Sequence, residues 1–159
     1  MLPSPHERMV ADMVAALARS LYHLLDHHRL DDAVRVLDPH FRGHGCGSDR
    51  AGFQAEMAAC LAGFPDLRIS VRQLVTEETR VAAFIILRGT HQGRFAGVSP
   101  SGRTIEIAGV DLLEERGGAL MEAWSLRDLN GLWIQLGVLP ASVHDQRPPI
   151  HAIPRQPRS

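Results

Sequence analysis

The sequence contains no lysine, because all 17 residues counted as Lys or Arg are arginine. Chemistry that needs a lysine amine, as in Schiff-base aldolases and pyridoxal enzymes, is therefore excluded, with the N-terminus as the only remaining amine. Cysteine is also scarce. Cys46 and Cys60 are too few for a disulfide framework, and neither stands in a spacing typical of metal sites. We expect a protein of a reducing compartment that binds no metal.

Long apolar runs are absent as well. No stretch approaches the roughly 20 residues that a membrane-spanning helix needs, and the N-terminus lacks a basic segment followed by an apolar one. The net charge of the 159 residues is −1, so there is no basic field to attract nucleic acid. We therefore expect one cytoplasmic domain that binds neither membranes nor nucleic acid.

Several catalytic signature motifs are missing too. The sequence has no nucleophile elbow, no Gly-rich phosphate loop, no dinucleotide fingerprint and no His-Glu-x-x-His zinc motif. Hydrolase triads, nucleotide chemistry and zinc catalysis thus have no support in the sequence. We expect a protein that works without a cofactor.

The N-terminal part of the chain carries helix signals. A serine, a proline and a glutamate within residues 4–7 form the pattern of an N-cap with a capping box. Apolar residues three or four apart then predict helices over 5–27, 30–37 and 49–63. Gly63 suits the left-handed position that commonly follows a helix.

Further along, apolar and polar residues alternate, which is typical of strands. The pattern predicts antiparallel strands over 67–72, 80–91, 104–115 and 120–128, with a hairpin turn at Gly117-Gly118. The second of these strands is apolar throughout its middle, which predicts a central strand covered on both faces. Helices followed by strands indicate the α+β class.

The end of the chain changes in composition. Residues 129–137 are apolar and predict a short closing helix, and beyond them the sequence is rich in proline, histidine and arginine. We therefore expect a domain over 4–139, followed by a mobile tail over 140–159.

Several short stretches form an ordered set with characteristic gaps between them. They are Phe64-Pro65-Asp66-Leu67-Arg68, Gly89-Thr90-His91, Pro100-Ser101-Gly102-Arg103, Gly109-Val110-Asp111, Glu122-Ala123-Trp124 and Gln135-Leu136-Gly137. This set resembles the SnoaL-like polyketide cyclases over residues 17–137. The resemblance implies the cone-shaped α+β barrel of the nuclear transport factor 2-like superfamily, in which a curved antiparallel sheet packs against N-terminal helices.

The resemblance also implies an internal pocket, a small apolar substrate with carbonyl groups, and a homodimer packed sheet against sheet. The apolar run over 81–87 supports the dimer, since one layer of helices covers only one face of a strand. The reaction stays open, because the superfamily includes cyclases, epoxide hydrolases, isomerase-like enzymes and proteins that only bind ligands. One position departs from the pattern: the family often has histidine where this chain has Ala123.

Asp128 is the first catalytic candidate, because the matching acid of the family resembles the proton-transfer group of the aldol cyclases. Burial in an apolar cone would raise the pKa of such a carboxyl and make it a better base near neutral pH. Asp128 also directly precedes the predicted closing helix, where an aspartate is a good N-cap. The sequence leaves both roles open.

Asp111 is the second catalytic candidate. It is in phase with Ile105, Ile107 and Leu113, so without a β-bulge its side chain enters an apolar row. A buried carboxylate without a partner is costly, so we expect Asp111 either to face the cavity or to form an ion pair, for instance with an arginine.

Three further side chains are candidate substrate contacts. Trp124 shares the parity of Asp128 on its strand and could form a pocket wall, although an aromatic at the middle of a sheet is also ordinary core. His44 matches a histidine that the family often places at the pocket rim. His91 ends a strand, and either histidine could donate to a carbonyl, although both could equally be incidental.

The helix stripes supply the remaining candidate contacts, Leu17, Leu21, Phe53 and Met57, because these residues must face the sheet. The leading hypothesis is a cofactor-independent cyclase or isomerase in which Asp128 removes a proton and Asp111 or His44 stabilises the oxyanion. The alternatives are a non-catalytic binding or accessory protein and an epoxide or lactone hydrolase.

Overall fold

The first helix, α1 (Pro5–Asp26), begins at the cap that the sequence predicts. In the computed structural model, which describes residues 4–140, Ser4 Oγ accepts from the Glu7 backbone N–H at 3.2 Å. The Glu7 carboxylate in turn accepts from the Ser4 N–H, which completes the capping box. The predicted tail beyond residue 140 lies outside the described residues.

Three further helices are shorter. α2 spans Leu30–Arg35, α3 spans Arg50–Gly63, and α4 spans Leu129–Gln135. The Asp49 carboxylate accepts from Gly52 N at 2.8 Å and caps the start of α3. No helix within residues 4–140 has the length and hydropathy that crossing a membrane requires.

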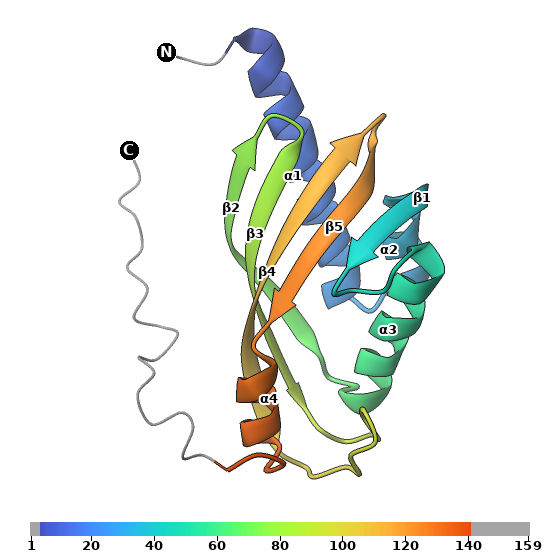
Figure 1. Cartoon of the computed structure of the whole chain (residues 1–159), viewed down its shortest axis with the longest axis vertical. Helices are drawn as coiled ribbons and strands as arrows, with labels where there is room; N and C mark the ends of the chain where they lie inside the picture. Colours follow the sequence, from blue (N-terminus) through green and yellow to red (C-terminus); the bar gives the residue numbers. More distant parts are fainter. Residues whose placement is uncertain (1–3, 141–159) are drawn as a thin grey trace.

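Five strands form one curved, open sheet on which the helices pack (Figure 1). The strands are β1 (Leu37–His44), β2 (Arg68–Glu77), β3 (Arg80–Thr90), β4 (Thr104–Arg116) and β5 (Ala119–Arg127). Their order across the sheet is β1-β5-β4-β3-β2. Strands β2 to β5 form the predicted antiparallel meander, and β1 adds to the edge parallel to β5.

The central strand is β4, not β3 as the sequence analysis predicts. In the row of strands β3 is the neighbour of the edge strand β2. Burial along β3 alternates over most of its length, because the helices cover only its concave side. One face of the apolar run over 81–87 is therefore buried, and the other is half-exposed at Ala82 and Phe84 but buried at Ile86.

The concave side of the sheet holds the core. α1 runs across β2, β3 and β4, while α3 packs on β1 and α2, and α4 packs on β4 (Figure 1). Buried aliphatic and aromatic side chains from all five strands meet the helices on this side. The outer side of the sheet has no helical layer among the described residues.

A β-bulge between β4 and β5 decides which side chains face the core. Next to the hairpin turn, Arg116 pairs with Ala119, but beyond the bulge at Glu114 and Glu115 the register moves by one residue. A shift of one residue exchanges the two faces of a strand relative to its partner. Beyond the bulge, each residue of β5 therefore faces the side of the sheet opposite to the one predicted from the hairpin register alone.

Gly63 has a different role from the predicted one. It is the last residue of α3 and is absent from the glycines with positive φ, so it is not a left-handed cap. A Cβ on Gly63 would lie 2.7 Å from Cβ of Phe95. Glycine is therefore needed here for the close approach of the loop after β3, not for backbone conformation.

Candidate functional site

A cavity of about 160 Å³ lies between the concave sheet, α1 and α3. Its wall is predominantly aliphatic and aromatic, with side chains from every strand and from α1, α3 and α4. Gly45, Glu56 and Leu129 are exposed lining residues, so the cavity opens between α3 and the junction of β5 with α4. It is a predominantly apolar chamber inside the fold.

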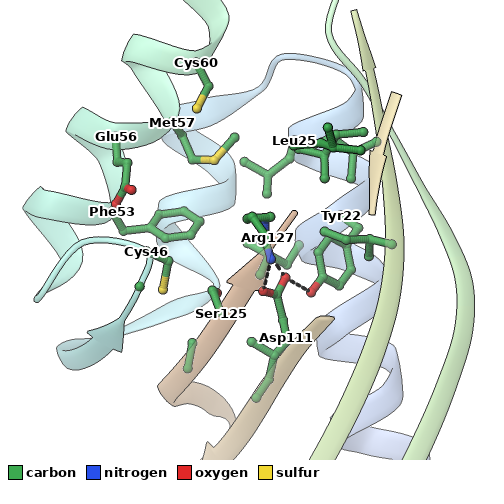
Figure 2. Close-up of a pocket in the computed structure, with 18 of the residues that line it drawn as sticks. Tyr22, Leu25, Cys46, Phe53, Glu56, Met57, Cys60, Asp111, Ser125 and Arg127 are labelled. Atoms are coloured by element: carbon green, nitrogen blue, oxygen red, sulfur yellow. Dashed lines mark hydrogen bonds and ion pairs between the residues drawn. The ribbon is translucent and has the colours of Figure 1, made fainter. Parts of the chain in front are cut away.

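Three polar side chains from three elements meet at the cavity wall (Figure 2). The Asp111 carboxylate of β4 forms a two-point ion pair with the Arg127 guanidinium of β5, with Oδ1–Nη1 at 2.7 Å and Oδ2–Nη2 at 3.1 Å. The Tyr22 hydroxyl of α1 donates to Oδ2 of Asp111 at 2.6 Å. We call these three residues the polar cluster.

The polar cluster keeps its charges despite burial. Burial and the negative charge of Asp111 raise the pKa of Tyr22 well above its ordinary value, so the phenol stays protonated and donates. Burial by itself would lower the pKa of Arg127, but the Asp111 carboxylate outweighs this effect and the pKa is raised. Arg127 is therefore a permanent cation inside an apolar chamber.

Other functional groups along the wall are weaker candidates for chemistry. Burial raises the pKa of the Cys46 thiol and raises that of the Cys60 thiol to about 11, so both stay protonated and are poor nucleophiles. Glu56 stands on α3 at the mouth, across the chamber from Arg127 (Figure 2). Among residues 4–140, no three His, Cys, Asp or Glu side chains group as a metal site would require.

The structure places some of the predicted site residues in the cavity wall. Leu21, Phe53 and Met57 line the chamber from α1 and α3, and Asp111 lines it from β4. The two alternatives for Asp111 both hold, because its side chain, 5% exposed, faces the cavity and is also paired with an arginine. Leu17 of α1 packs against the core but does not line the chamber.

Asp128 is not among the residues that line the cavity. It stands at the N-cap of α4, where its Oδ1 accepts from the Gly131 backbone N–H at 3.0 Å. This capping geometry is one of the two roles that the sequence leaves open for Asp128. The structure therefore separates the two candidate carboxylates: Asp111 borders the chamber and Asp128 caps a helix.

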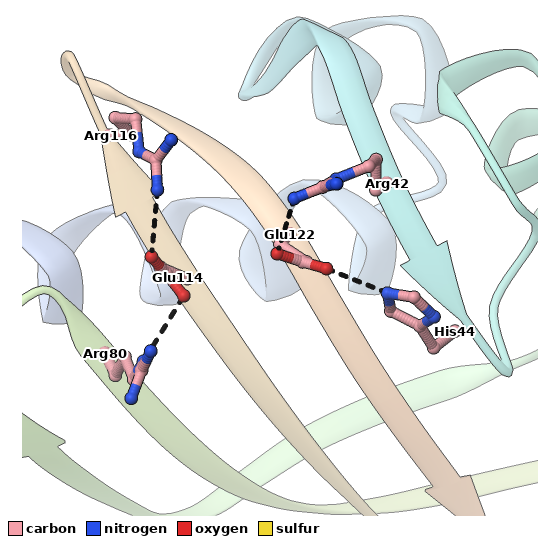
Figure 3. A network of polar contacts seen from close by, with 6 residues as sticks. All are labelled: Arg42, His44, Arg80, Glu114, Arg116 and Glu122. Atoms are coloured by element: carbon pink, nitrogen blue, oxygen red, sulfur yellow. Dashed lines mark hydrogen bonds and ion pairs between the residues drawn. The ribbon is translucent and has the colours of Figure 1, made fainter.

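Trp124 and His44 lie on the outer side of the sheet, contrary to the predicted pocket positions. Their rings stack with centroids 5.0 Å apart and planes 10° apart. His44 Nε2 lies 2.9 Å from Oε1 of Glu122, whose other oxygen accepts from Arg42 (Figure 3). The physical reason is the bulge, which pairs Asp111 with Ser125 across the ladder, so that Ser125 faces inward with Asp111.

His91 is fully buried but also lies outside the cavity lining. The Ser101 backbone N–H donates to its Nδ1 at 3.2 Å, and its ring lies against Phe64 with centroids 5.3 Å apart. Phe64 in turn packs on Phe95, which does line the chamber. Two aromatic rings thus separate His91 from the cavity.

Sequence reasoning missed Arg127 and Tyr22. The need for an ionic partner near Asp111 pointed to an arginine in general, but only the register of β4 with β5 selects Arg127, which lies on the face of Ser125. Tyr22 follows Leu21 on the buried side of α1 and is the only tyrosine in the sequence. Its position on a core-facing stripe was the available signal.

A family model of SnoaL-like polyketide cyclases matches residues 15–136. The chain belongs to this family. The fold agrees, since the curved open sheet with N-terminal helices is that of the SnoaL-like structures. No curated protein matches the sequence significantly.

Solved structures from bacteria superpose well on this SnoaL-like chain. AclR from Streptomyces galilaeus, a proposed hydroxylase, is 28% identical with a TM-score of 0.76, over 82% of this chain and 88% of its own. IdmH from Streptomyces antibioticus, a proposed polyketide cyclase, is 28% identical with a TM-score of 0.69, over 79% and 99%. A SnoaL-like protein from Jannaschia sp. CCS1 is 24% identical with a TM-score of 0.73, over 88% and 99%, which supports the fold.

Proposed function

We propose that this SnoaL-like protein is a cofactor-independent cyclase or isomerase acting on a small apolar molecule with carbonyl groups. The observation that carries the proposal is the polar cluster, because it sets a carboxylate and a permanent cation side by side in the wall of an apolar chamber. Acid–base chemistry next to a carbonyl needs these two functions: a base for the C–H proton and a positive partner for the developing oxyanion.

Asp111 serves as the base in this scheme. An ionised carboxylate offers about four lone-pair sites, and Arg127 and Tyr22 donate to Asp111 through three hydrogen bonds. The remaining acceptor capacity is on Oδ1, and a proton taken from carbon would be received there. The ring closure or double-bond shift then returns the proton to the product.

Arg127 stabilises the enolate oxygen. Its guanidinium has five N–H donors. Two of them donate to Asp111 and one to the Leu126 carbonyl, which leaves two for the substrate. The side chain is 23% exposed and therefore reaches the open part of the chamber. The aliphatic wall keeps water away from the remainder of the substrate, and the absence of water strengthens these charge interactions. The same wall holds the substrate in a folded geometry.

Exchange of carbon-bound hydrogen tests the proposal without knowledge of the natural substrate. A base beside a bound ketone abstracts an α-proton reversibly, so in D₂O the enzyme would incorporate deuterium into the methyl group of acetophenone, followed by NMR. The wild-type protein is expected to exceed the buffer rate, and Asp111→Asn to lose about a hundredfold or more of that activity.

Asp128→Asn is the matched control, since it removes an equivalent charge outside the cavity lining and leaves an N-cap residue in place. It should exchange acetophenone at the wild-type rate. Equal loss in both variants, or no exchange by the wild-type protein, would refute Asp111 as the base. The absence of exchange would favour the non-catalytic binding protein among the alternatives.

A hydrolase is the second candidate function. The chamber holds two acidic side chains, Asp111 and Glu56, and epoxide opening needs one carboxylate to activate water and one acid to protonate the leaving oxygen. Styrene oxide tests this candidate: hydrolysis that is lost in Glu56→Gln, with ketone exchange unchanged, would favour the hydrolase over the cyclase.

We also propose a homodimer through the outer face of the sheet. Val110 and Leu112 of β4 and Trp124 and Leu126 of β5 are exposed there, and Leu112 is the cross-strand partner of Trp124. Contiguous exposed apolar side chains commonly mark an interface. Ion pairs border this area, and their charges are already compensated within the chain (Figure 3).

A further inference from the structure

The chamber is small. We infer that the site selects a neutral substrate the size of one ring, and that Met57 sets the upper limit of that size; the inference rests on the proposed function only in placing the substrate in this chamber. Its volume of about 160 Å³ is close to that of an engineered apolar cavity of about 150 Å³ that binds benzene. Typical pockets for larger ligands are about 300 Å³ and above.

The side chains on the sheet side of the chamber cannot move apart to make room for a larger ligand. Ile85, Ile107 and Leu113 line it and are each at most 5% exposed, and they belong to the same core that holds α1 on the sheet. Displacing them would open gaps throughout a closely packed interior. The size limit on this side is therefore fixed by the fold.

The α3 side is different. Phe53 is buried and its ring packs edge-to-face on Phe41 of β1 at 6.0 Å, so it is held in place. Met57, one turn further along α3, is only partly buried and extends over the chamber (Figure 2). Methionine is unbranched and adaptable, so shortening it adds space with little change to the rest of the core.

The charges of the chamber select neutral molecules. Among residues 4–140, the lining has two acidic side chains, Asp111 and Glu56, and one cation, Arg127. This cation is already bound to Asp111 at two points. An anionic ligand would meet one uncompensated carboxylate at the mouth and, inside, a cation whose charge Asp111 already balances. A neutral ketone or ester meets no such barrier.

Three aryl methyl ketones with the same reactive group test the size limit. Acetophenone, acetylnaphthalene and acetylanthracene have one, two and three rings, and apolar area alone would make the largest bind most tightly. Calorimetric titration should instead give acetophenone a dissociation constant at least about tenfold below that of acetylanthracene. Affinities that rise with ring number would overturn the inference.

Variants of Met57 assign the limit to this residue. Met57→Ala should improve acetylanthracene binding by about tenfold, whereas Met57→Leu, which conserves volume, and Met13→Ala, which truncates a methionine outside the chamber, should keep the wild-type order. Thermal unfolding of each variant verifies that it folds. An unchanged order in a folded Met57→Ala would refute the role of Met57.

Binding and turnover separate the two proposals. A one-ring preference without deuterium exchange would support the size limit and refute the proposed acid–base function. Exchange of acetophenone together with tighter binding of acetylanthracene would do the reverse. Benzoate, the anionic analogue, should bind at least about tenfold more weakly than acetophenone if the chamber selects neutral ligands.

Discussion

Asp111 is a charged side chain inside an apolar wall, a position that is tolerated only because Arg127 and Tyr22 compensate it. Removing one partner of a buried pair is more damaging than removing both, since the remaining charge is left without a partner. The three side chains come from α1, β4 and β5, so their contacts also hold the helix on the sheet. The three groups of the proposed acid–base site therefore also stabilise the fold.

Tyr22→Phe is therefore expected to destabilise the fold. The variant keeps the ring but leaves Asp111 without one donor, and a hydrogen bond to a charged group contributes about 2 kcal/mol. A double-mutant cycle by urea unfolding should show that Tyr22→Phe costs much less when Asp111 is already Asn. Strictly additive effects would contradict the hydrogen bond between the two side chains.

At the scale of elements, Asp26 joins the end of α1 to the start of β2. Its Oδ1 accepts from the Ile69 backbone N–H at 2.7 Å and from Nε of Arg68 at 2.9 Å, while Oδ2 accepts from Nη2 of Arg68 at 2.8 Å. The hydrogen bond from Arg68 is the main reason that the pKa of Asp26 falls to about 2. Because the pKa of Asp26 is lower in the folded protein than its ordinary value, the stabilisation that this contact provides depends on pH.

Asp26→Asn should lower the free energy of unfolding by about 1 to 2 kcal/mol at pH 7, an amount that allows for the exposure of Arg68. Because the folded-state pKa lies below the ordinary value of 3.8, the stabilisation is present above about pH 4 and disappears as the pH falls through about 2. Urea unfolding from pH 7 down to pH 2 measures the difference. A difference independent of pH would contradict this assignment.

The N-cap of α4 is Asp128, and its contribution to stability can be measured. If the role of Asp128 is to cap this helix, Asp128→Ala should cost about 1 kcal/mol while Asp128→Asn costs much less, because asparagine is an equally good cap. Thermal unfolding compares the two. Equal losses in both variants would mean that the charge of Asp128, not its capping hydrogen bond, stabilises the fold.

The sequence predicted those elements whose signals are local. The capping pattern within residues 4–7 and the turn at Gly117-Gly118 each act over a few residues, and both appear as predicted. The inward face of β5 was not predictable in this way, because one extra residue of β5, Met121, lies opposite the step from Glu114 to Glu115 and reverses that face. A bulge depends on how two strands pair with each other, and no short residue pattern in β5 marks it.

The same limit applies to the candidate site. Asp111 was identified because a carboxylate in an apolar row stands out in the sequence alone. Arg127 and Tyr22 are separated from it by 16 and 89 positions, and nothing local marks either as its partner. Asp128 was also identified from the sequence, but its carboxylate caps a helix by accepting from a backbone N–H three residues away.

At the scale of the whole molecule, the sheet has two sides with different roles. The concave side encloses the chamber, and the outer side exposes an apolar area that includes Leu126, 74% exposed. If a second copy covers this area, sedimentation should give twice the mass of one chain, and Leu126→Glu should give a monomer. Met9→Glu, at an exposed position of α1, is the control and should remain a dimer. A monomeric wild-type protein at micromolar concentration would contradict the dimer.

In the proposed function, the chamber binds the substrate and presents it to Asp111 and Arg127. A crystal structure of the protein saturated with acetophenone tests this most directly. We expect the ring to lie between α3 and the sheet, with the carbonyl oxygen within hydrogen-bond distance of Arg127 and the methyl carbon beside Asp111. Acetophenone on the outer face against Trp124, or an empty chamber in the saturated crystal, would contradict it.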